Sequence, residues 1–289
     1  MKQSTRIFFT LVLSAFFLQG TAQKPAYLLY NEHGNDTSYE SMVEACAEAD
    51  VILFGELHNN PISHWLQLQL TNDIHAIIGG DLVLGAEMFE RDGQLLIDEY
   101  FSGFITQAKF EEDSRLWKNY KTDYKPLLEF AHENNLKFIG TNIPRRYANS
   151  VYNLGLDTLK FLTKEAKKYL MPLPLSYDTT LNCYTSLAGG GPMGHGSPNL
   201  RDAQAVKDAT MTHFIMENLK KDETFIHYNG AYHSDNFESM YYFLKMADKK
   251  LNIVTISTVS QKNIDVLSED NLNKAHFIIC VPDDMTTTY

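Results

Sequence analysis

The chain has 289 residues, of which 44% are hydrophobic and 21% are charged, a composition typical of a globular protein with one sizeable core. Its formal net charge of −11 at pH 7 argues against nucleic acid and anionic membrane surfaces as partners. Three cysteines allow at most one disulfide within the chain, which excludes a disulfide-stapled scaffold.

The N-terminus has the three parts of a secretory signal peptide. Lys2 and Arg6 make a basic start, residues 7–18 are apolar, and small residues follow at 20–22. The apolar stretch is shorter than the roughly 20 residues that a membrane-spanning helix needs. We therefore expect residues 1–22 to be a signal peptide, and 23–289 to form one exported domain.

Segments with strand and helix patterns alternate along the chain. Strands are expected at 27–30, 51–54, 82–86, 137–140, 224–228, 253–256 and 277–281. Helices are expected between them, at 38–49, 61–78, 94–101, 127–134, 147–170, 201–220 and 237–247. This alternation predicts an α/β fold with a largely parallel central sheet flanked by helices.

The helix expected at 61–78 has the clearest signals. Asn60 can cap it, Pro61 suits its first turn, and Gly79 follows its end. Helical spacing predicts that its core-facing residues are Ile62, Trp65, Leu66, Leu70, Ile74 and Ile77.

Residues 171–199 differ from the rest of the chain because they are rich in glycine and proline. A stretch of this length without a helix or strand pattern predicts a long loop inserted into the domain, of the kind that often binds a ligand.

Polar residues follow four of the expected strands, at the point where each strand ends. They are Glu56 and His58, then Glu87, Glu90 and Arg91, then Asn142 and Arg145, and finally His227, His233 and Asp235. Because the carboxyl ends of parallel strands meet at one edge of a sheet, we expect these side chains to share a site. Two of the strand ends have the form Gly-x-x-His, with glycines at Gly55 and Gly230 that permit a sharp turn.

Two imidazoles and a carboxylate in one cleft would suit a divalent metal, so His58, His233 and Glu56 are the expected metal ligands. Manganese, zinc and cobalt are the metals we consider. Glu56 or Glu87 could then act as a general base on metal-bound water, which would make the protein a metal-dependent hydrolase. The alternative is a non-catalytic surface scaffold in which these residues are purely structural.

Haem is the other expected cofactor, because it requires an apolar slot and an axial tyrosine, histidine or methionine. Spacing does not single out one ligand. The residues considered lie on the atypical loop or near the strand ends, and they are Tyr147, Tyr177, Tyr184, His195 and Tyr232.

Six motifs in chain order resemble the ChaN-like haem-binding family of the Tiki/TraB/erythromycin-esterase superfamily, and the resemblance covers roughly residues 27–260. The motifs are Gly55-Glu56-x-His58-x-Asn60-Pro61-x-x-His64; Glu87-Met88-Phe89-Glu90-Arg91-Asp92; Trp117 and Tyr120 with Tyr124-x-Pro126; Asn142-x-Pro144-Arg145; Gln204-x-x-x-Asp208-x-x-Met211; and Gly230-Ala231-Tyr232-His233.

The resemblance implies an α/β fold whose strand ends form the site, and a bacterial protein exported to the periplasm or outer membrane for haem or iron acquisition. It implies haem or another tetrapyrrole held in a homodimer with tyrosine as axial ligand, and outer-membrane uptake machinery as a partner. The wider superfamily includes metal-dependent proteases and esterases, and Glu56, His58 and His233 match their site positions. This chain lacks the lipobox cysteine of many family members, so we expect it to be soluble or held by a partner.

Overall fold

The computed structural model describes residues 24–189 and 197–289, so the expected signal peptide and His195 lie outside the described residues. Seven strands form one sheet in the order β1-β7-β6-β2-β5-β3-β4. The strands are β1 (Leu28–Asn31), β2 (Val51–Glu56), β3 (Leu82–Glu90), β4 (Lys137–Asn142), β5 (Thr224–Gly230), β6 (Ile253–Gln261) and β7 (Phe277–Pro282). Only β1 runs antiparallel to its neighbour, so the prediction of a largely parallel sheet is confirmed.

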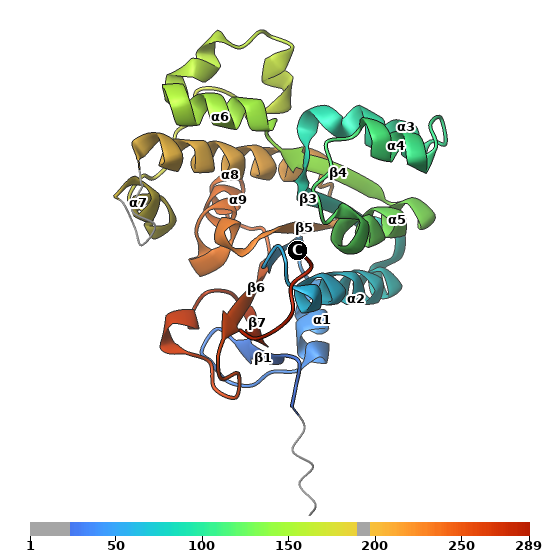
Figure 1. The fold of residues 1–289 in the computed structure, drawn as a ribbon, viewed down its shortest axis with the longest axis vertical. Coiled ribbons are helices and arrows are strands. Elements are labelled where there is room, and N and C mark those ends of the chain that lie inside the picture. The colour runs from blue at the N-terminus through green and yellow to red at the C-terminus, as the bar shows by residue number, and fades with distance from the viewer. Residues whose placement is uncertain (1–23, 190–196) are drawn as a thin grey trace, which may run out of the picture.

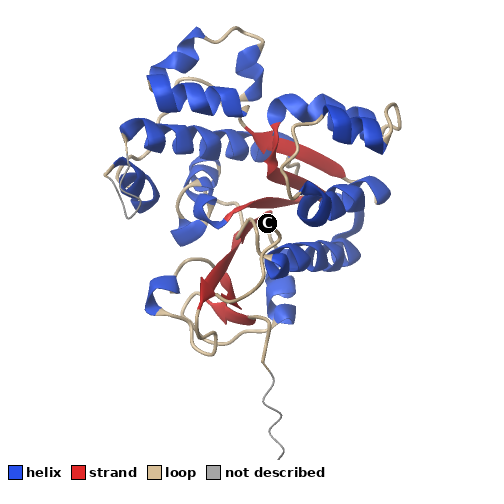
Figure 2. Ribbon diagram, in the orientation of Figure 1, coloured by secondary structure: helices blue, strands red, loops and turns tan. Residues whose placement is uncertain are grey.

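Helices cover both faces of this sheet (Figures 1 and 2). In Figure 1, α8 and α9 lie to the left of the sheet, and α2 and α5 lie to its right. The α-helices are α1 (Tyr39–Ala47), α2 (Pro61–Ile78), α3 (Gln94–Phe101), α4 (Gln107–Asp113), α5 (Lys125–Glu133), α6 (Arg145–Leu154), α7 (Asn182–Ala188), α8 (Pro198–Asn218) and α9 (Met240–Ala247).

Strand β2 shows why this chain folds as layers. Every residue of β2 is buried, because the strand lies inside the sheet with helices on both sides. Val51 and Leu53 belong to the apolar cluster formed with α8 and α9, whereas Ile52 and Phe54 belong to the cluster formed with α1 and α2. This alternation follows from the two-residue period of a strand.

Helix α2 begins and ends at the predicted residues, and the side chain of Asn60 caps it by accepting a hydrogen bond from the backbone N–H of Ser63. The predicted core-facing set was wrong at two positions, since Trp65 is 48% exposed and Ile77 is 58% exposed. The buried face of the helix instead includes a polar stripe, a row of polar side chains formed by His64, Gln67 and Thr71. These side chains are buried because they hydrogen-bond to groups at the sheet, as described below.

The prediction that 171–199 has no regular structure was wrong for residues 182–188, which form α7. This short helix is stabilised by burial of Cys183 and Tyr184, and the phenol of Tyr184 donates a hydrogen bond to Asp208 on α8. None of the helices in the described residues is both long and apolar enough to cross a membrane.

Candidate functional site

A cavity of about 850 Å³ lies at the carboxyl edge of the sheet. It is lined by residues at and just beyond the carboxyl ends of β2, β3, β4 and β5, together with residues from α6, α7 and α8, so many of the residues expected at the strand ends lie together here. The lining side chains and glycine are Glu56, Leu57, His58, Glu87, Glu90, Trp117, Asn142, Ile143, Arg145, Ala148, Asn149, Tyr152, Leu187, Leu200, Ala203, Gln204, Lys207, Gly230, Ala231, Tyr232 and His233.

Glu56 is the buried centre of one half of the site. Its Oε1 is 2.8 Å from Nδ1 of His58 and accepts a hydrogen bond from the phenol of Tyr124 at 2.7 Å. Its Oε2 accepts a hydrogen bond from the amide of Gln67 at 2.6 Å. Because three donors surround it, the carboxylate is held in one orientation and in turn fixes the imidazole of His58.

The second half of the site is a chain of two carboxylates and one imidazole. The Nε2 atom of His233 is 3.2 Å from Oε1 of Glu87, and its Nδ1 is hydrogen-bonded to Asp208. All three side chains are buried. Gln204 also contacts His233, so the motif Gln-x-x-x-Asp on α8 positions the histidine that follows β5.

The two halves meet over Gly230. Its backbone N–H donates a hydrogen bond to Oε2 of Glu87 at 2.8 Å. A Cβ atom at this position would lie 2.7 Å from Nε2 of His58. Glycine is therefore required here because the imidazole of His58 rests directly on the backbone.

The charges within the site stabilise one another. Burial disfavours the charged forms of His233 and Glu87. The charges of Glu87 and Asp208 nevertheless raise the pKa of His233, and the charge of His233 lowers the pKa of Glu87 well below its usual range. Burial also opposes charge on His58, yet the hydrogen bond that it donates to Glu56 and the charge of Glu87 raise its pKa. The pKa shifts thus favour the ionised form of Glu87 and the protonated forms of His58 and His233.

Not every residue expected from the sequence lines the cavity. Arg91 lies over the ring of Phe214 and donates to Gln94, so it belongs to the packing of α3 and α8. His64 lies behind Glu56, with ring nitrogens near Gln67 and the backbone carbonyl of His58. His227 is buried inside the sheet between Thr141 and Asn229 rather than at its edge.

The tyrosines proposed as haem ligands lie in different parts of the structure, and not all of them line the cavity. Tyr232 lines the cavity. Tyr177 and Tyr184 lie in the core cluster around α7 and α8, where they donate hydrogen bonds to Asp202 and Asp208 respectively. Tyr147 is partly buried in the same cluster, with Arg146 over its ring.

Two aromatic residues that were not among the expected site residues line the cavity, Trp117 in the segment after α4 and Tyr152 on α6. The ring of Trp117 packs edge-on against His58, with a centroid distance of 5.0 Å. The place of Trp117 among the family motifs could have indicated a role at the site, whereas nothing in the sequence indicated one for Tyr152.

The arrangement does not present a metal-binding set. Among residues 24–189 and 197–289, no group of three or more histidine, cysteine, aspartate and glutamate side chains is placed to hold a metal ion. Both ring nitrogens of His233 face carboxylates, and Glu56 already accepts three hydrogen bonds. The proposed ligands His58, His233 and Glu56 would have to exchange these partners before they could bind a metal.

Comparison of the chain with models of protein families identifies the family to which it belongs. The family model described as haem-binding uptake, Tiki superfamily, ChaN matches residues 42–244. The chain belongs to this family. The matched range contains every strand end that lines the cavity, but it excludes β6, β7 and the residues after them.

Solved structures show the same fold. The structure titled cofacial heme binding to ChaN of Campylobacter jejuni matches with a TM-score of 0.67 at 18% identity, covering 88% of this chain and 96% of that chain. A Bacillus cereus protein matches with a TM-score of 0.50 at 13% identity, covering 88% of this chain and 94% of that one. A succinoglycan biosynthesis protein has a TM-score of 0.50 at 10% identity, with coverages of 89% and 94%. No curated protein matches the chain.

Proposed function

We propose that the protein binds haem in the cavity at the strand ends. The observation that carries this proposal is an apolar wall in a cavity of about 850 Å³, within the range of small-molecule and cofactor sites. The wall is formed by Leu57, Ile143, Ala148, Leu187, Leu200, Ala203 and Trp117. Membership of a haem-binding family and the fold shared with ChaN support the same ligand.

The axial ligand we propose is Tyr152. Two tyrosines line the cavity. The phenol of Tyr232 donates a hydrogen bond to the carbonyl of Cys183 at 2.5 Å and lies 2.8 Å from the hydroxyl of Ser186. Tyr152 is 46% exposed, and its phenol makes no hydrogen bond to any described residue, so it is free to coordinate iron.

Titration of the purified protein with haem tests this assignment. We expect a Soret band that saturates at a defined stoichiometry. Tyr152→Phe should remove the high-spin spectrum of a tyrosine-ligated haem, whereas Tyr232→Phe and the control Tyr177→Phe, at a residue that does not line the cavity, should retain it. Absent or unsaturable binding by the unaltered protein would refute haem binding. A wild-type spectrum from Tyr152→Phe would refute only the choice of ligand.

We further propose that the protein is exported and takes part in haem or iron acquisition, as a homodimer that delivers haem to or receives it from outer-membrane uptake machinery. The expected signal at 1–22 supports export. Protein recovered from the periplasm or medium should begin at residue 23, and a strain without it should grow poorly on haem as sole iron source. An uncleaved cytoplasmic product, or unchanged growth, would contradict these steps. Light scattering with and without haem tests the dimer.

A second candidate function is hydrolysis, because haem binding alone does not explain two carboxylate–imidazole pairs in one cavity. Glu56–His58 and Glu87–His233 are poised to move protons, which is the chemistry of general acid–base catalysis. Peptide and ester substrates should be tested with and without added manganese, cobalt or zinc, alongside elemental analysis. Hydrolysis abolished by Glu87→Gln would support this function, and absence of hydrolysis under every condition would exclude it for those substrates. A purely structural role instead predicts that His58→Ala and His233→Ala change stability and no activity.

A further inference from the structure

The residues after β7 return across the molecule to the half of the site around Glu56. The backbone N–H of Thr288 donates a hydrogen bond to the carbonyl of Asn59, in the turn between β2 and α2. The hydroxyl of Thr288 donates to Oδ2 of Asp123 at 2.8 Å. Residues 283–289, which we call the C-terminal strap, therefore join two segments that lie far apart in the sequence.

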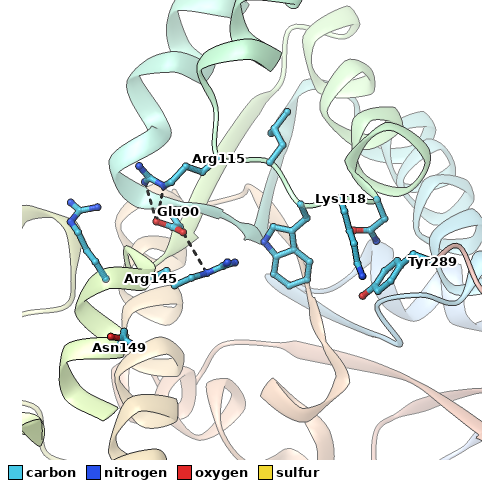
Figure 3. A pocket seen from close by; sticks show the side chains of 10 residues that line it. Glu90, Arg115, Lys118, Arg145, Asn149 and Tyr289 are labelled. Atoms are coloured by element: carbon cyan, nitrogen blue, oxygen red, sulfur yellow. Dashed lines mark hydrogen bonds and ion pairs between the residues drawn. The ribbon is translucent and has the colours of Figure 1, made fainter. Parts of the chain in front are cut away.

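The strap also contacts Lys118 through Tyr289. The ring of Tyr289 lies 4.0 Å from the ammonium nitrogen of Lys118, a cation–π contact, and Figure 3 shows the two side chains side by side. Both residues line a hollow of about 900 Å³ that adjoins the cavity and shares Trp117 with it. The strap thus holds a residue that is next to Trp117 in the sequence.

Residues 117–124, which we call the wall segment, include a π-helix at Tyr120–Tyr124. Turns of this width are rare, and they occur mostly as single turns at functional sites. Asp123 lies in this turn and is buried. Its Oδ2 accepts hydrogen bonds from the amide of Asn119 at 2.7 Å and from the hydroxyl of Thr288. The strap therefore helps to satisfy a buried carboxyl group in the π-helix.

The wall segment makes three contacts with the Glu56 half of the site. The phenol of Tyr124 donates to Oε1 of Glu56 at 2.7 Å. The ring of Trp117 packs edge-on against His58, and the amide of Asn119 donates to the backbone carbonyl of His58 at 2.9 Å. Because all three contacts come from one short segment, a shift of that segment would displace them together.

We propose that the hydroxyl of Thr288 positions Trp117 and Tyr124 at the cavity, so that the strap controls how tightly the cavity holds its ligand. This inference rests on the proposed haem-binding function, since Trp117 is part of the apolar wall offered to the ligand. Thr288 is a positioning residue, because it acts on the ligand through Asp123 and the wall segment. The strap lies outside the family-matched residues 42–244.

Three substitutions at neighbouring threonines of the full-length mature protein separate positioning from stability. Thr288→Val removes the hydroxyl that bonds to Asp123 and keeps the backbone N–H that bonds to Asn59. Thr288→Ser keeps a hydroxyl and is the rescue variant. Thr287→Val is the matched control, because the hydroxyl of Thr287 donates within the strap, to the carbonyl of Tyr289.

The position of Trp117 is measured first, without ligand. The chain has two tryptophans, so Trp65→Phe leaves Trp117 as the only one, and acrylamide quenching of its fluorescence reports its access to solvent. In this background we expect Thr288→Val to raise the quenching constant, whereas Thr288→Ser and Thr287→Val should leave it unchanged. An unchanged constant for Thr288→Val would overturn the positioning role, whether or not the protein binds haem.

Haem affinity is measured next, together with the thermal midpoint of each protein. We expect Thr288→Val to weaken haem binding about five-fold, as for the loss of one hydrogen bond, and the other two variants to bind as the unaltered protein does. A lower thermal midpoint for Thr288→Val with unchanged haem affinity would show a purely structural role and overturn the inference. Failure of the unaltered protein to bind haem saturably would instead refute the proposed function, and the control of haem affinity with it, while the quenching result still decides whether Thr288 positions Trp117.

Discussion

At the scale of single residues, Gly230 controls the distance between the two halves of the site. Its missing side chain leaves room for Nε2 of His58, and an added Cβ would lie 2.7 Å from that atom. We expect Gly230→Ala to displace His58 from Glu56 and to lower the free energy of unfolding by about 1–3 kcal/mol, measured by urea denaturation. Gly93→Ala is the control, because nothing lies within 4 Å of its added Cβ. Equal effects of the two substitutions would contradict this role.

A second prediction at the scale of single residues concerns His227 and the stability of the protein in acid. Burial lowers the pKa of its imidazole to about 4 from the usual 6.5, so the folded protein keeps this side chain neutral. Because the unfolded chain binds the proton more readily, the stabilisation is present above pH 6.5 and is lost as the pH falls toward 4.

We therefore expect this effect of His227 to lower the free energy of unfolding by up to about 3 kcal/mol between pH 7 and pH 4. Urea midpoints for the unaltered protein and for His227→Gln, which cannot titrate, measure the effect. The variant is expected to be less stable at pH 7 but to lose less on acidification. Identical pH slopes would show that His227 is not the responsible group.

At the scale of elements, helix α2 contributes to the site through its row of buried polar side chains. Gln67 is fully buried and donates to Oε2 of Glu56 at 2.6 Å, whereas its near neighbour Trp65 is 48% exposed. Gln67→Leu keeps a similar volume but removes a donor from a buried carboxylate, so we expect a loss of about 1–3 kcal/mol. Trp65→Gln should cost less than about 1 kcal/mol. Denaturant midpoints rank the two variants, and the reverse order would refute the inward orientation of the stripe.

This helix also shows where sequence reasoning stops. Its caps predicted both ends correctly, because Asn60, Pro61 and Gly79 act within one turn. Its buried face was mispredicted at Trp65 and Ile77 because apolarity was used as the criterion. Hydrogen bonds to Glu56 and Tyr228 allow Gln67 and Thr71 to be buried. Which side chains of α2 are buried therefore depends on hydrogen-bond partners that are distant in the sequence. The spacing of apolar residues within the helix carries no information about those partners.

At the scale of the whole molecule, the shared edge of parallel strands made the site predictable. Glu56, Glu87 and His233 lie far apart in the sequence, yet each lies at or just beyond the carboxyl end of a strand at the same edge of the sheet. His227 was grouped with them wrongly, because it lies inside β5 before the end of the strand and its side chain is buried between Thr141 and Asn229. Tyr152 was missed because its place on the cavity wall depends on how α6 packs.

The whole sheet also extends beyond the family-matched residues. Strand β6 follows residue 244 and lies between β2 and β7, so it covers an edge of the strand that carries Glu56. A chain limited to residues 24–250 contains the complete family match but leaves that edge unpaired and loses the buried side chains of β6 and β7. We expect this shortened chain to lack a cooperative thermal transition and near-ultraviolet circular dichroism. A chain of residues 24–283, which keeps all seven strands, should unfold cooperatively. Cooperative unfolding of the shorter chain would show instead that the family-matched residues form an autonomous folding unit.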